Sequence, residues 1–325
     1  EELWQPKGNA PFHFEFPGSV QGFTVTSGAG EIANVEGHSS LGQRSLRLQG
    51  DPETRFGTPV FTPSVDTARY FDGKGYALMA SPRVYPGQTI QGRISGSGSA
   101  NLYVAAYGEN DEVVISRGES VPLTDSGVDF SMPVPDVQPV FEIGVEIAGG
   151  DVVFLDYLSW SGEPDVTFQQ PSAPRGKNPA LMWRRAWVNG VDELWTFVES
   201  FRLMQNEGRG LIIQGTRDWQ NYSVTADVTP HMAKAAGIAA RVQGMRRYYG
   251  LLLGQDQKVR LVKMVNDETV LANAEFEWAF GDTIELGLTV DGERITGSLN
   301  GKMILEATDS ELTCGGIALV SEEGR

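Results

Sequence analysis

Residues 283–305 read TIELGLTVDGERITGSLNGKMIL, and this stretch contains three short apolar runs joined by two turn dipeptides. Asp291-Gly292 and Asn300-Gly301 separate the runs, and such dipeptides accept the positive φ of tight hairpin turns. Every second residue of the first run is apolar, which is the period of a β-strand with one buried face: Ile284, Leu286, Leu288 and Val290. We therefore expect two consecutive β-hairpins here.

Similar runs recur along the whole chain, broken by Gly, Pro, Asn and Asp. In the first half they are Gly22–Thr26, Ser45–Gln49, Tyr76–Met79, Thr89–Ile94, Asn101–Tyr107, Asp129–Met132, Phe141–Ile147 and Val152–Trp160. In the second half they are Gly210–Gln214, Tyr222–Thr229, Gly237–Gln243, Tyr248–Leu253, Lys258–Val265, Glu268–Asn273, Thr283–Asp291, Arg294–Leu299, Lys302–Ala307 and Gly315–Ser321. Many short strands at this spacing, with almost no helical periodicity, predict an all-β protein of two tandem β-sandwich (jelly-roll) domains.

Alternation within the run Gly237–Gln243 predicts which of its side chains share a face of the sheet. One face is expected to carry Ile238, Ala240 and Val242. The other is expected to carry Ala239, Arg241 and Gln243.

The strand pattern stops between Asp165 and Leu181, where three prolines occur with almost no apolar residues. Such a stretch is typical of an interdomain connection. The length of 325 residues is also about that of two average domains. We therefore predict domains at residues 1–164 and 183–325, with a linker at residues 165–182.

The chain is acidic, with 26 basic and 42 acidic residues and a formal net charge of −16. The imbalance is concentrated in the part up to Glu163, where nine basic and 21 acidic residues give −12. Nucleic-acid binding depends on a basic surface that releases counterions, so we expect no DNA or RNA partner. The acidic first half favours neutral ligands or a cation.

Other features limit the possible cellular compartments without identifying one. The single cysteine, Cys314, permits no intrachain disulfide, which is compatible with a bacterial cytoplasmic or a secreted protein. No run approaches the ~20 apolar residues of a membrane span. The opening Glu1-Glu2-Leu3-Trp4 has no signal-peptide pattern, so we interpret the chain as a fragment or a processed chain.

The first half resembles the galactose-binding-like jelly rolls that serve as carbohydrate-binding modules. The resemblance rests on the opening Phe14–Phe23, on the turn and strand His38–Leu46, and on the last strand Phe154–Trp160. The chain departs from these modules because position 23 is not Trp.

This resemblance implies a structural calcium site. In such jelly rolls an acid from the first strand and one from the last strand meet beside the turn, and Glu15 and Asp156 fall on those positions. Carbonyl groups near Ser39 and Gly42 would complete the six to eight oxygen ligands that Ca²⁺ requires. The alternative is that both acids are ordinary solvated or hydrogen-bonded strand residues.

The second half is similar to the laminin-G or concanavalin-A-like lectin superfamily, over roughly residues 202–325. The matching segments are Asp218–Val224, Gly237–Val242, Tyr248–Leu253, the hairpin Asp291–Leu305 and the ending Gly315–Leu319. A narrower resemblance links Met182–Asp192 and Gln205–Gly210 to the region downstream of the catalytic domain in multidomain bacterial ADP-ribosylglycohydrolase-like proteins. None of that family's acidic magnesium motifs occurs here, so it implies an accessory region.

Two groups of residues are candidate ligand contacts. Sugars stack on aromatic rings and hydrogen-bond to polar groups, which makes Trp183, Arg184 and Trp187 one candidate set. The alternative is that the two tryptophans cover a core edge where the linker enters the second domain.

The second candidate set lies on and beside the strand Gly237–Gln243, where a lectin-like sheet presents side chains to a ligand. It comprises Arg241, Gln243, Arg246, Arg247 and Tyr248. The adjacent arginines could bind a carboxylate or phosphate bidentately. The alternative is a solvated edge hairpin.

Together these features favour a non-catalytic, carbohydrate-binding tandem module, an accessory part of a larger bacterial hydrolase. One alternative is an assembly module that packs on an upstream ADP-ribosylglycohydrolase-like catalytic domain, with Trp and Arg as interface anchors. Another is a polysaccharide hydrolase or lyase on the second sandwich, although no recognisable catalytic pair is present. Calcium is the only cofactor that we expect.

Overall fold

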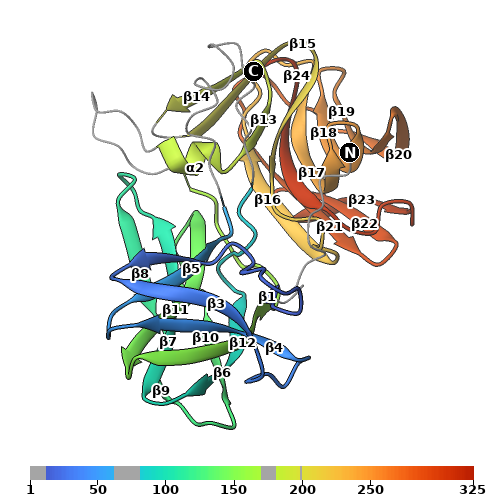
Figure 1. Ribbon diagram of the computed structural model, residues 1–325. Helices are drawn as coiled ribbons and strands as arrows, with labels where there is room; N and C mark the ends of the chain where they lie inside the picture. Colours follow the sequence, from blue (N-terminus) through green and yellow to red (C-terminus); the bar gives the residue numbers. More distant parts are fainter. Residues whose placement is uncertain (1–11, 62–80, 170–180, 198–199) are drawn as a thin grey trace. The chain divides into compact units, whose positions relative to one another are not determined.

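The computed structural model describes residues 12–61, 81–169, 181–197 and 200–325 (Figure 1). Regular structure in these ranges is almost entirely β, which confirms the predicted all-β fold; the one helix described is α2 (Leu181–Arg185). The described chain forms two compact units, one of residues 12–61, 82–169 and 181–184 and the other of residues 81, 185–197 and 200–325. The predicted strand Tyr76–Met79 and residues 170–180 of the predicted linker lie outside the described residues.

The first unit contains two antiparallel sheets. One has the strand order β10-β6-β12-β4-β3, with β1 paired to β12; its strands are β1 (Phe12–His13), β3 (Gly30–Glu36), β4 (Arg44–Gly50), β6 (Thr89–Gly96), β10 (Val128–Pro133) and β12 (Val152–Ser161). The other has the order β2-β5-β11-β7-β8, with β9 paired to β7; its strands are β2 (Thr24–Ser27), β5 (Arg55–Pro59), β7 (Ser99–Tyr107), β8 (Val113–Arg117), β9 (Val121–Pro122) and β11 (Val140–Gly149).

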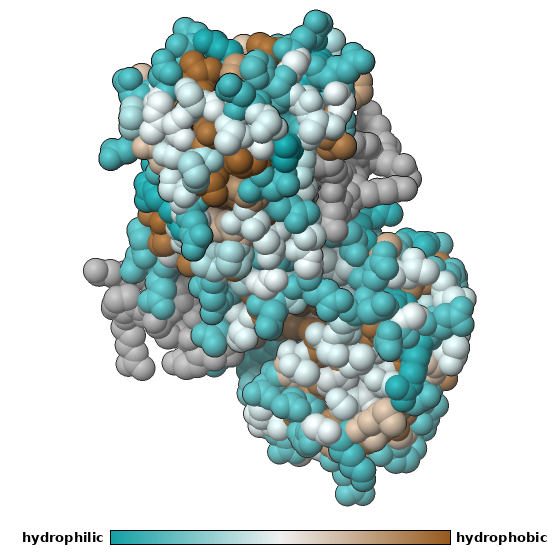
Figure 2. Space-filling model, turned by 90° about the horizontal axis from the view of Figure 1, so that it is seen from below, coloured by the Kyte–Doolittle hydropathy of each residue, from teal (hydrophilic) through white to brown (hydrophobic). Residues whose placement is uncertain are grey.

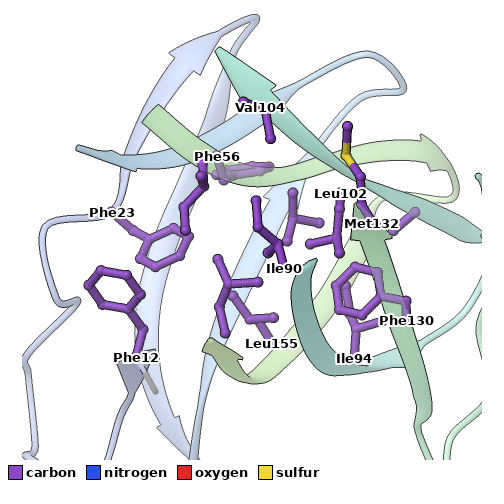
Figure 3. Packing of buried hydrophobic residues seen from close by; sticks show 14 of the residues in the cluster. Phe12, Phe23, Phe56, Ile90, Ile94, Leu102, Val104, Phe130, Met132 and Leu155 are labelled. Atoms are coloured by element: carbon purple, nitrogen blue, oxygen red, sulfur yellow. The ribbon is translucent and has the colours of Figure 1, made fainter. Parts of the chain in front are cut away.

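The inner faces of these two sheets pack into one hydrophobic core (Figure 3). Ile90 and Leu155 contribute from the first sheet, and Phe56 and Leu102 from the second. All four are fully buried, and each such side chain stabilises the fold by roughly 1.5–3 kcal/mol. Because every second residue of each strand faces this core, the intervening residues face outward.

The second unit contains an eight-stranded and a four-stranded sheet. The larger has the order β13-β15-β24-β17-β18-β19-β20, with β14 paired to β15; its strands are β13 (Val188–Gly190), β14 (Glu193–Phe197), β15 (Ser200–Gln214), β17 (Ala235–Gly244), β18 (Arg247–Gly254), β19 (Lys258–Val265), β20 (Asp267–Glu275) and β24 (Gly316–Gly324). The smaller has the order β16-β21-β22-β23 and comprises β16 (Tyr222–Val228), β21 (Ile284–Asp291), β22 (Arg294–Leu299) and β23 (Lys302–Thr308).

The hairpins predicted from residues 283–305 are confirmed. Asp291 pairs with Arg294 across the first turn, and Leu299 pairs with Lys302 across the second. The inner row is confirmed as well, because its four apolar side chains join the core between the two sheets: Ile284, Leu286, Leu288 and Val290.

The predicted alternation in β17 is wrong beyond Ala240. The backbone of Arg241 has a positive φ of 48°, and the pairing of β17 with both neighbours shifts register around it. Ile238 and Ala240 face the sandwich core, whereas Val242 joins Ala239 in a second cluster. A β-bulge inserts one residue into a strand and so reverses the side-chain order after it.

On the face that Figure 2 shows, hydrophilic and intermediate residues predominate, and hydrophobic residues form several separate patches. The large apolar side chains that are exposed come from many different elements: Phe16, Leu41, Val113, Met232, Met245, Val270, Phe280 and Met303. The only described helix has five residues, and none in these ranges has the length and apolar character needed to cross a bilayer.

Candidate functional site

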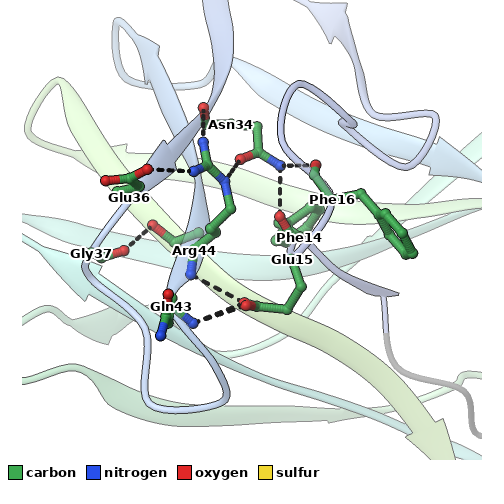
Figure 4. Close-up of polar contacts among 9 residues, drawn as sticks. Phe14, Glu15, Phe16, Asn34, Glu36, Gly37, Gln43 and Arg44 are labelled. Atoms are coloured by element: carbon green, nitrogen blue, oxygen red, sulfur yellow. Dashed lines mark hydrogen bonds and ion pairs between the residues drawn. The ribbon is translucent and has the colours of Figure 1, made fainter.

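The two acids predicted to bind calcium both hold the loop that follows β3. The Glu15 carboxylate accepts the backbone N–H groups of Gln43 and Arg44 at 3.0–3.1 Å (Figure 4). A Cβ added to Gly42 would lie 2.3 Å from the carboxyl carbon of Glu15, so the loop backbone packs directly against this acid.

Asp156 holds the same loop. It stands at a register shift of β12 and is 2% exposed. Its oxygens accept hydrogen bonds of 2.7 Å from the Ser39 hydroxyl and from both the N–H and the hydroxyl of Ser40. The N–H of Leu41 adds weaker contacts at 3.3–3.4 Å.

These carboxylates therefore face N–H and O–H donors, which is how an acid stabilises a loop without a metal. A calcium ion at this place would have to displace several of those donors. In the described part of the chain, no group of three or more His, Cys, Asp or Glu side chains is placed to hold a metal ion. Calcium at Glu15, Ser39, Gly42 and Asp156 stays a prediction.

The tryptophans of the first candidate set are buried. Trp183 is 7% exposed and Trp187 is 2% exposed, and the Trp187 ring contacts Phe201 edge-on at 5.3 Å. Arg184, between them in sequence, is half-buried at the end of α2. Rings this buried do not offer a face to a sugar in solution, which favours the core-edge alternative.

Arg241 is also buried, at 1% exposed. Its guanidinium donates to the carbonyl oxygens of Gln220 and Leu312 at 3.0 and 2.9 Å and to the side-chain oxygen of Asn221 at 3.3 Å. Its own backbone N–H donates to the Tyr222 hydroxyl at 2.6 Å. The bulge directs the Arg241 side chain toward these acceptors. The guanidinium therefore holds the segments that carry them together.

Of the rest of the second candidate set, the structure brings Gln243, Arg246 and Arg247 to the β17–β18 turn, where Nε of Arg247 donates to the side-chain oxygen of Gln243 at 3.3 Å, but it does not bring Tyr248 to this surface. Tyr248 is fully buried, and its hydroxyl is 3.2 Å from Nη1 of Arg209. Gln243 donates to the carbonyl of Cys314 at 2.9 Å. Arg246 and Arg247 are exposed at the β17–β18 turn, where Arg246 donates to the Asn266 carbonyl.

A different cluster lies on the outer face of the sheet β2-β5-β11-β7-β8 in the first unit. The odd-numbered residues of β7 and the even-numbered residues near the middle of β11 point away from the core, because Leu102, Val104, Ile143 and Val145 point into it. We call this cluster the Tyr103 face and define it by Arg55, Asn101, Tyr103, Arg117, Glu142 and Glu146.

Tyr103 lies across the sheet because two neighbouring residues have no side chain. Gly144 pairs with Tyr103, and Gly57 pairs with Gly144 on the next strand. A Cβ on Gly144 would lie 2.8 Å from the Tyr103 ring, and one on Gly57 would lie 2.3 Å from its hydroxyl oxygen. The two glycines therefore form the floor on which the ring rests.

The Tyr103 hydroxyl takes part in two hydrogen bonds, one as donor and one as acceptor. It donates to Glu142 at 2.6 Å, and its oxygen is 2.9 Å from the Thr26 hydroxyl, which therefore donates to it. Burial, followed by the nearby Glu142 charge, raises the pKa of Tyr103 far above its ordinary value. The phenol is thus a fixed donor, and the Arg55 guanidinium lies over its ring, 5.7 Å from the centroid.

Glu146, only 6% exposed, is shared by two arginines. Arg117 binds it bidentately with three contacts of 2.8–3.0 Å. Arg55 approaches it only to 3.9 Å. The hydrogen bond to Glu146, and its charge, raise the pKa of Arg117 despite some desolvation. Two cations and two carboxylates make the face close to neutral overall.

Asn101 stands out among the side chains of this face. It is 5% exposed and pairs directly with Glu146 across β7 and β11. Among the described residues, its amide nitrogen Nδ2 has no hydrogen-bond partner. A buried donor left without a partner costs roughly 1–3 kcal/mol.

Two half-buried aromatic residues border the face. Tyr107 and Phe141 stack with ring centroids 4.4 Å apart and planes 28° from parallel. Burial, followed by the charges of Asp111 and Glu142, raises the pKa of Tyr107.

None of these residues was among the sequence candidates, although the signal was present. Both Asn101–Tyr107 and Phe141–Ile147 were recognised as strands, and their outward positions hold polar and aromatic residues. Only the sheet order shows that β5, β7, β8 and β11 are neighbours.

The comparisons with known proteins concern the fold. No model of a known protein family matches the chain. No curated protein matches it either. Solved structures similar to it include the carbohydrate-binding module CBM66 from Bacillus subtilis, with 16% identity over 42% of this chain and 88% of the module, at a TM-score of 0.40.

Two others extend over more of the chain. The CBM22-1–CBM22-2 tandem domain of Paenibacillus barcinonensis Xyn10C has 13% identity, covers 96% of this chain and 88% of its own, and has a TM-score of 0.37. Domains LG4-5 of the mouse laminin α1 chain have 11% identity, with 73% and 75% covered and a TM-score of 0.27. At these identities and TM-scores the likenesses carry no assignment of function.

Proposed function

We propose that the first unit binds carbohydrate, without catalysis, at the Tyr103 face. The observation that carries the proposal is the set of oriented polar groups on this sheet: the fully buried Tyr103 fixes Glu142, and Arg55 and Arg117 share Glu146, beside the half-buried stacked rings of Tyr107 and Phe141. Ligand sites commonly combine aromatic surface with a few oriented polar groups.

The charges of the face indicate what kind of sugar fits. Arg55 and Arg117 share Glu146, and Glu142 accepts a hydrogen bond from Tyr103, so no cation is left without a carboxylate nearby. Hydroxyl groups can pair with both signs, whereas a carboxylated sugar would meet the two glutamates. The first half of the chain also has a net charge of −12. A neutral saccharide is therefore the ligand class that we propose.

The test is calorimetric titration with a panel of neutral oligosaccharides, namely hexasaccharides of cellulose, xylan, mannan, laminarin and starch. We expect one or more to bind, and Glu142→Gln to weaken that binding about tenfold or more, as for a lost hydrogen bond to a charged group. The matched control is Asp129→Asn, which alters a carboxylate on the other sheet, paired with Arg93. Absence of binding to the whole panel, or equal loss in both variants, contradicts the proposal.

The accessory role also remains a proposal. In a longer chain, the two units would hold an upstream catalytic domain near a polysaccharide or pack against that domain. Co-purification of the chain with a separately expressed upstream domain tests the packing alternative. Release of reducing sugar from the same panel would instead support a hydrolase on the second sandwich.

A further inference from the structure

An ion pair crosses the strand that carries Asn101. In the sheet, β7 lies between β8, which carries Arg117, and β11, which carries Glu146. The Arg117–Glu146 bridge must therefore pass over β7. Arg117 pairs with Tyr103 and Glu146 pairs with Asn101, so the bridge passes beside the Asn101 amide.

The Arg117 side of the ion pair is at the surface, whereas the amide is buried. The Arg117 side chain is 50% exposed, while Asn101 as a whole is 5% exposed. Long exposed side chains such as Arg change rotamer readily, whereas a buried strand residue does not. We expect the amide donor to become accessible from solvent if Arg117 turns outward.

Glu146 would not lose its charge compensation when Arg117 moves. Arg55 is already 3.9 Å from the same carboxylate and is 20% exposed at its side chain. A shift of about 1 Å brings Arg55 into hydrogen-bonding range of Glu146. Movement of Arg55 toward Glu146 also changes its position over the Tyr103 ring.

We propose that Asn101 is a specificity-determining residue of the carbohydrate site, which donates from Nδ2 to an oxygen of a neutral sugar. When the sugar binds, Arg117 moves away from Glu146 and Arg55 binds Glu146 in its place. The buried amide then gains the hydrogen-bond partner that it lacks in the free protein. This inference rests on the proposed function of the Tyr103 face. It adds that the ligand must project an acceptor oxygen toward β7.

The test measures both the thermal stability and the oligosaccharide affinity of a variant of the full chain. Asn101→Leu replaces the amide with an apolar group of similar size, so it removes an unpartnered buried donor. We expect Tm of the first transition to rise by about 2–4 °C, while affinity for the oligosaccharide that the unaltered chain binds falls tenfold or more. A purely structural asparagine would not move these two measurements in opposite directions.

Ser95→Ala is the matched control. Ser95 is also 5% exposed, and its hydroxyl has no partner among the described residues, but it lies on β6 in the other sheet. We expect this change to leave affinity unaltered. A second variant, Arg117→Gln, removes the Arg117–Glu146 ion pair while Arg55 remains, and it should raise the association rate several-fold.

The outcomes separate the two proposals. A lower Tm for Asn101→Leu means that the amide is satisfied in the free protein, by a bound water for example, and overturns this inference whatever the titration shows. Unaltered affinity of Asn101→Leu, or slower association of Arg117→Gln, overturns it while carbohydrate binding stands. Failure of the unaltered chain to bind any of the panel overturns the proposed function and this inference with it.

Discussion

The hydroxyl of Tyr103 donates a 2.6 Å hydrogen bond to Glu142 across the neighbouring strands β7 and β11. The two residues are 39 positions apart in the chain, and the ring between them rests on glycines. A buried phenol that is fixed to a half-buried carboxylate orients that carboxylate toward the outer face. It thereby links the stability of the sheet to the geometry of the proposed site.

Tyr103→Phe removes this hydrogen bond and the one from Thr26 while it keeps the ring. We expect the free energy of unfolding of the first unit to fall by about 1–3 kcal/mol, because Glu142 loses a charge-assisted donor. Denaturation in urea, followed by tyrosine and tryptophan fluorescence, measures it. Tyr157→Phe on the other sheet, which is only partly buried, is the control and should stay within about 0.5 kcal/mol of the unaltered chain.

Arg241→Met should destabilise the second unit strongly. Met keeps the unbranched apolar stem of the side chain but ends where the guanidinium begins and donates no hydrogen bond, so the acceptors of Gln220, Asn221 and Leu312 each lose a donor. We expect a loss of about 2–4 kcal/mol in thermal or urea unfolding. Arg246→Met, at the exposed turn after β17, is the matched change and should cost less than about 0.5 kcal/mol. Equal effects would contradict the assignment of Arg241 to the fold.

The loop held by Glu15 and Asp156 gives the test of calcium. If the ion binds here, melting of the first unit in millimolar CaCl₂ should occur at a higher temperature than in EDTA, and Asp156→Asn should abolish that difference. If hydrogen bonds alone hold the loop, EDTA has no effect. Asp156→Asn still lowers Tm, because an amide accepts fewer hydrogen bonds from Ser39 and Ser40. A Tm that is independent of calcium would remove the metal from this site.

The lowered pKa of Asp309 predicts that the stability of the second unit depends on pH. Burial alone would raise its pKa, but hydrogen bonds from Lys263 and Tyr249 outweigh burial and hold the pKa below the ordinary value of 3.8. A carboxyl group whose pKa is lower when folded stabilises the protein above its unfolded pKa, and this contribution is lost as the pH falls through the folded pKa.

Asp309→Asn should therefore be less stable than the unaltered chain at pH 7, and the difference should shrink progressively below about pH 4. Thermal melts between pH 7 and pH 2 provide the comparison. Glu306→Gln is a suitable control, because Glu306 also has a lowered pKa but lies in an exposed pair with Arg294. Its effect at pH 7 should be small, as for other surface ion pairs.

Local sequence determined the β class of this protein and its tight hairpins. The Asp291-Gly292 and Asn300-Gly301 turns and the apolar row of β21 depend on residues within a few positions of one another, and the structure confirms them. The face of Val242 was predicted wrongly, because the bulge at Arg241 depends on acceptors from Gln220 and Leu312. Such long-range contacts cannot be read from the alternation of apolar and polar residues along a strand.

The Tyr103 face was decided only by the tertiary structure. Its residues lie on β5, β7, β8 and β11, and the sheet order that joins these strands does not follow the order of the chain. Alternation predicts that Tyr103 and Glu142 point outward, but only the pairing of β11 with both β5 and β7 brings them onto the glycine floor. Non-local strand pairing, rather than any local propensity, therefore created the candidate site.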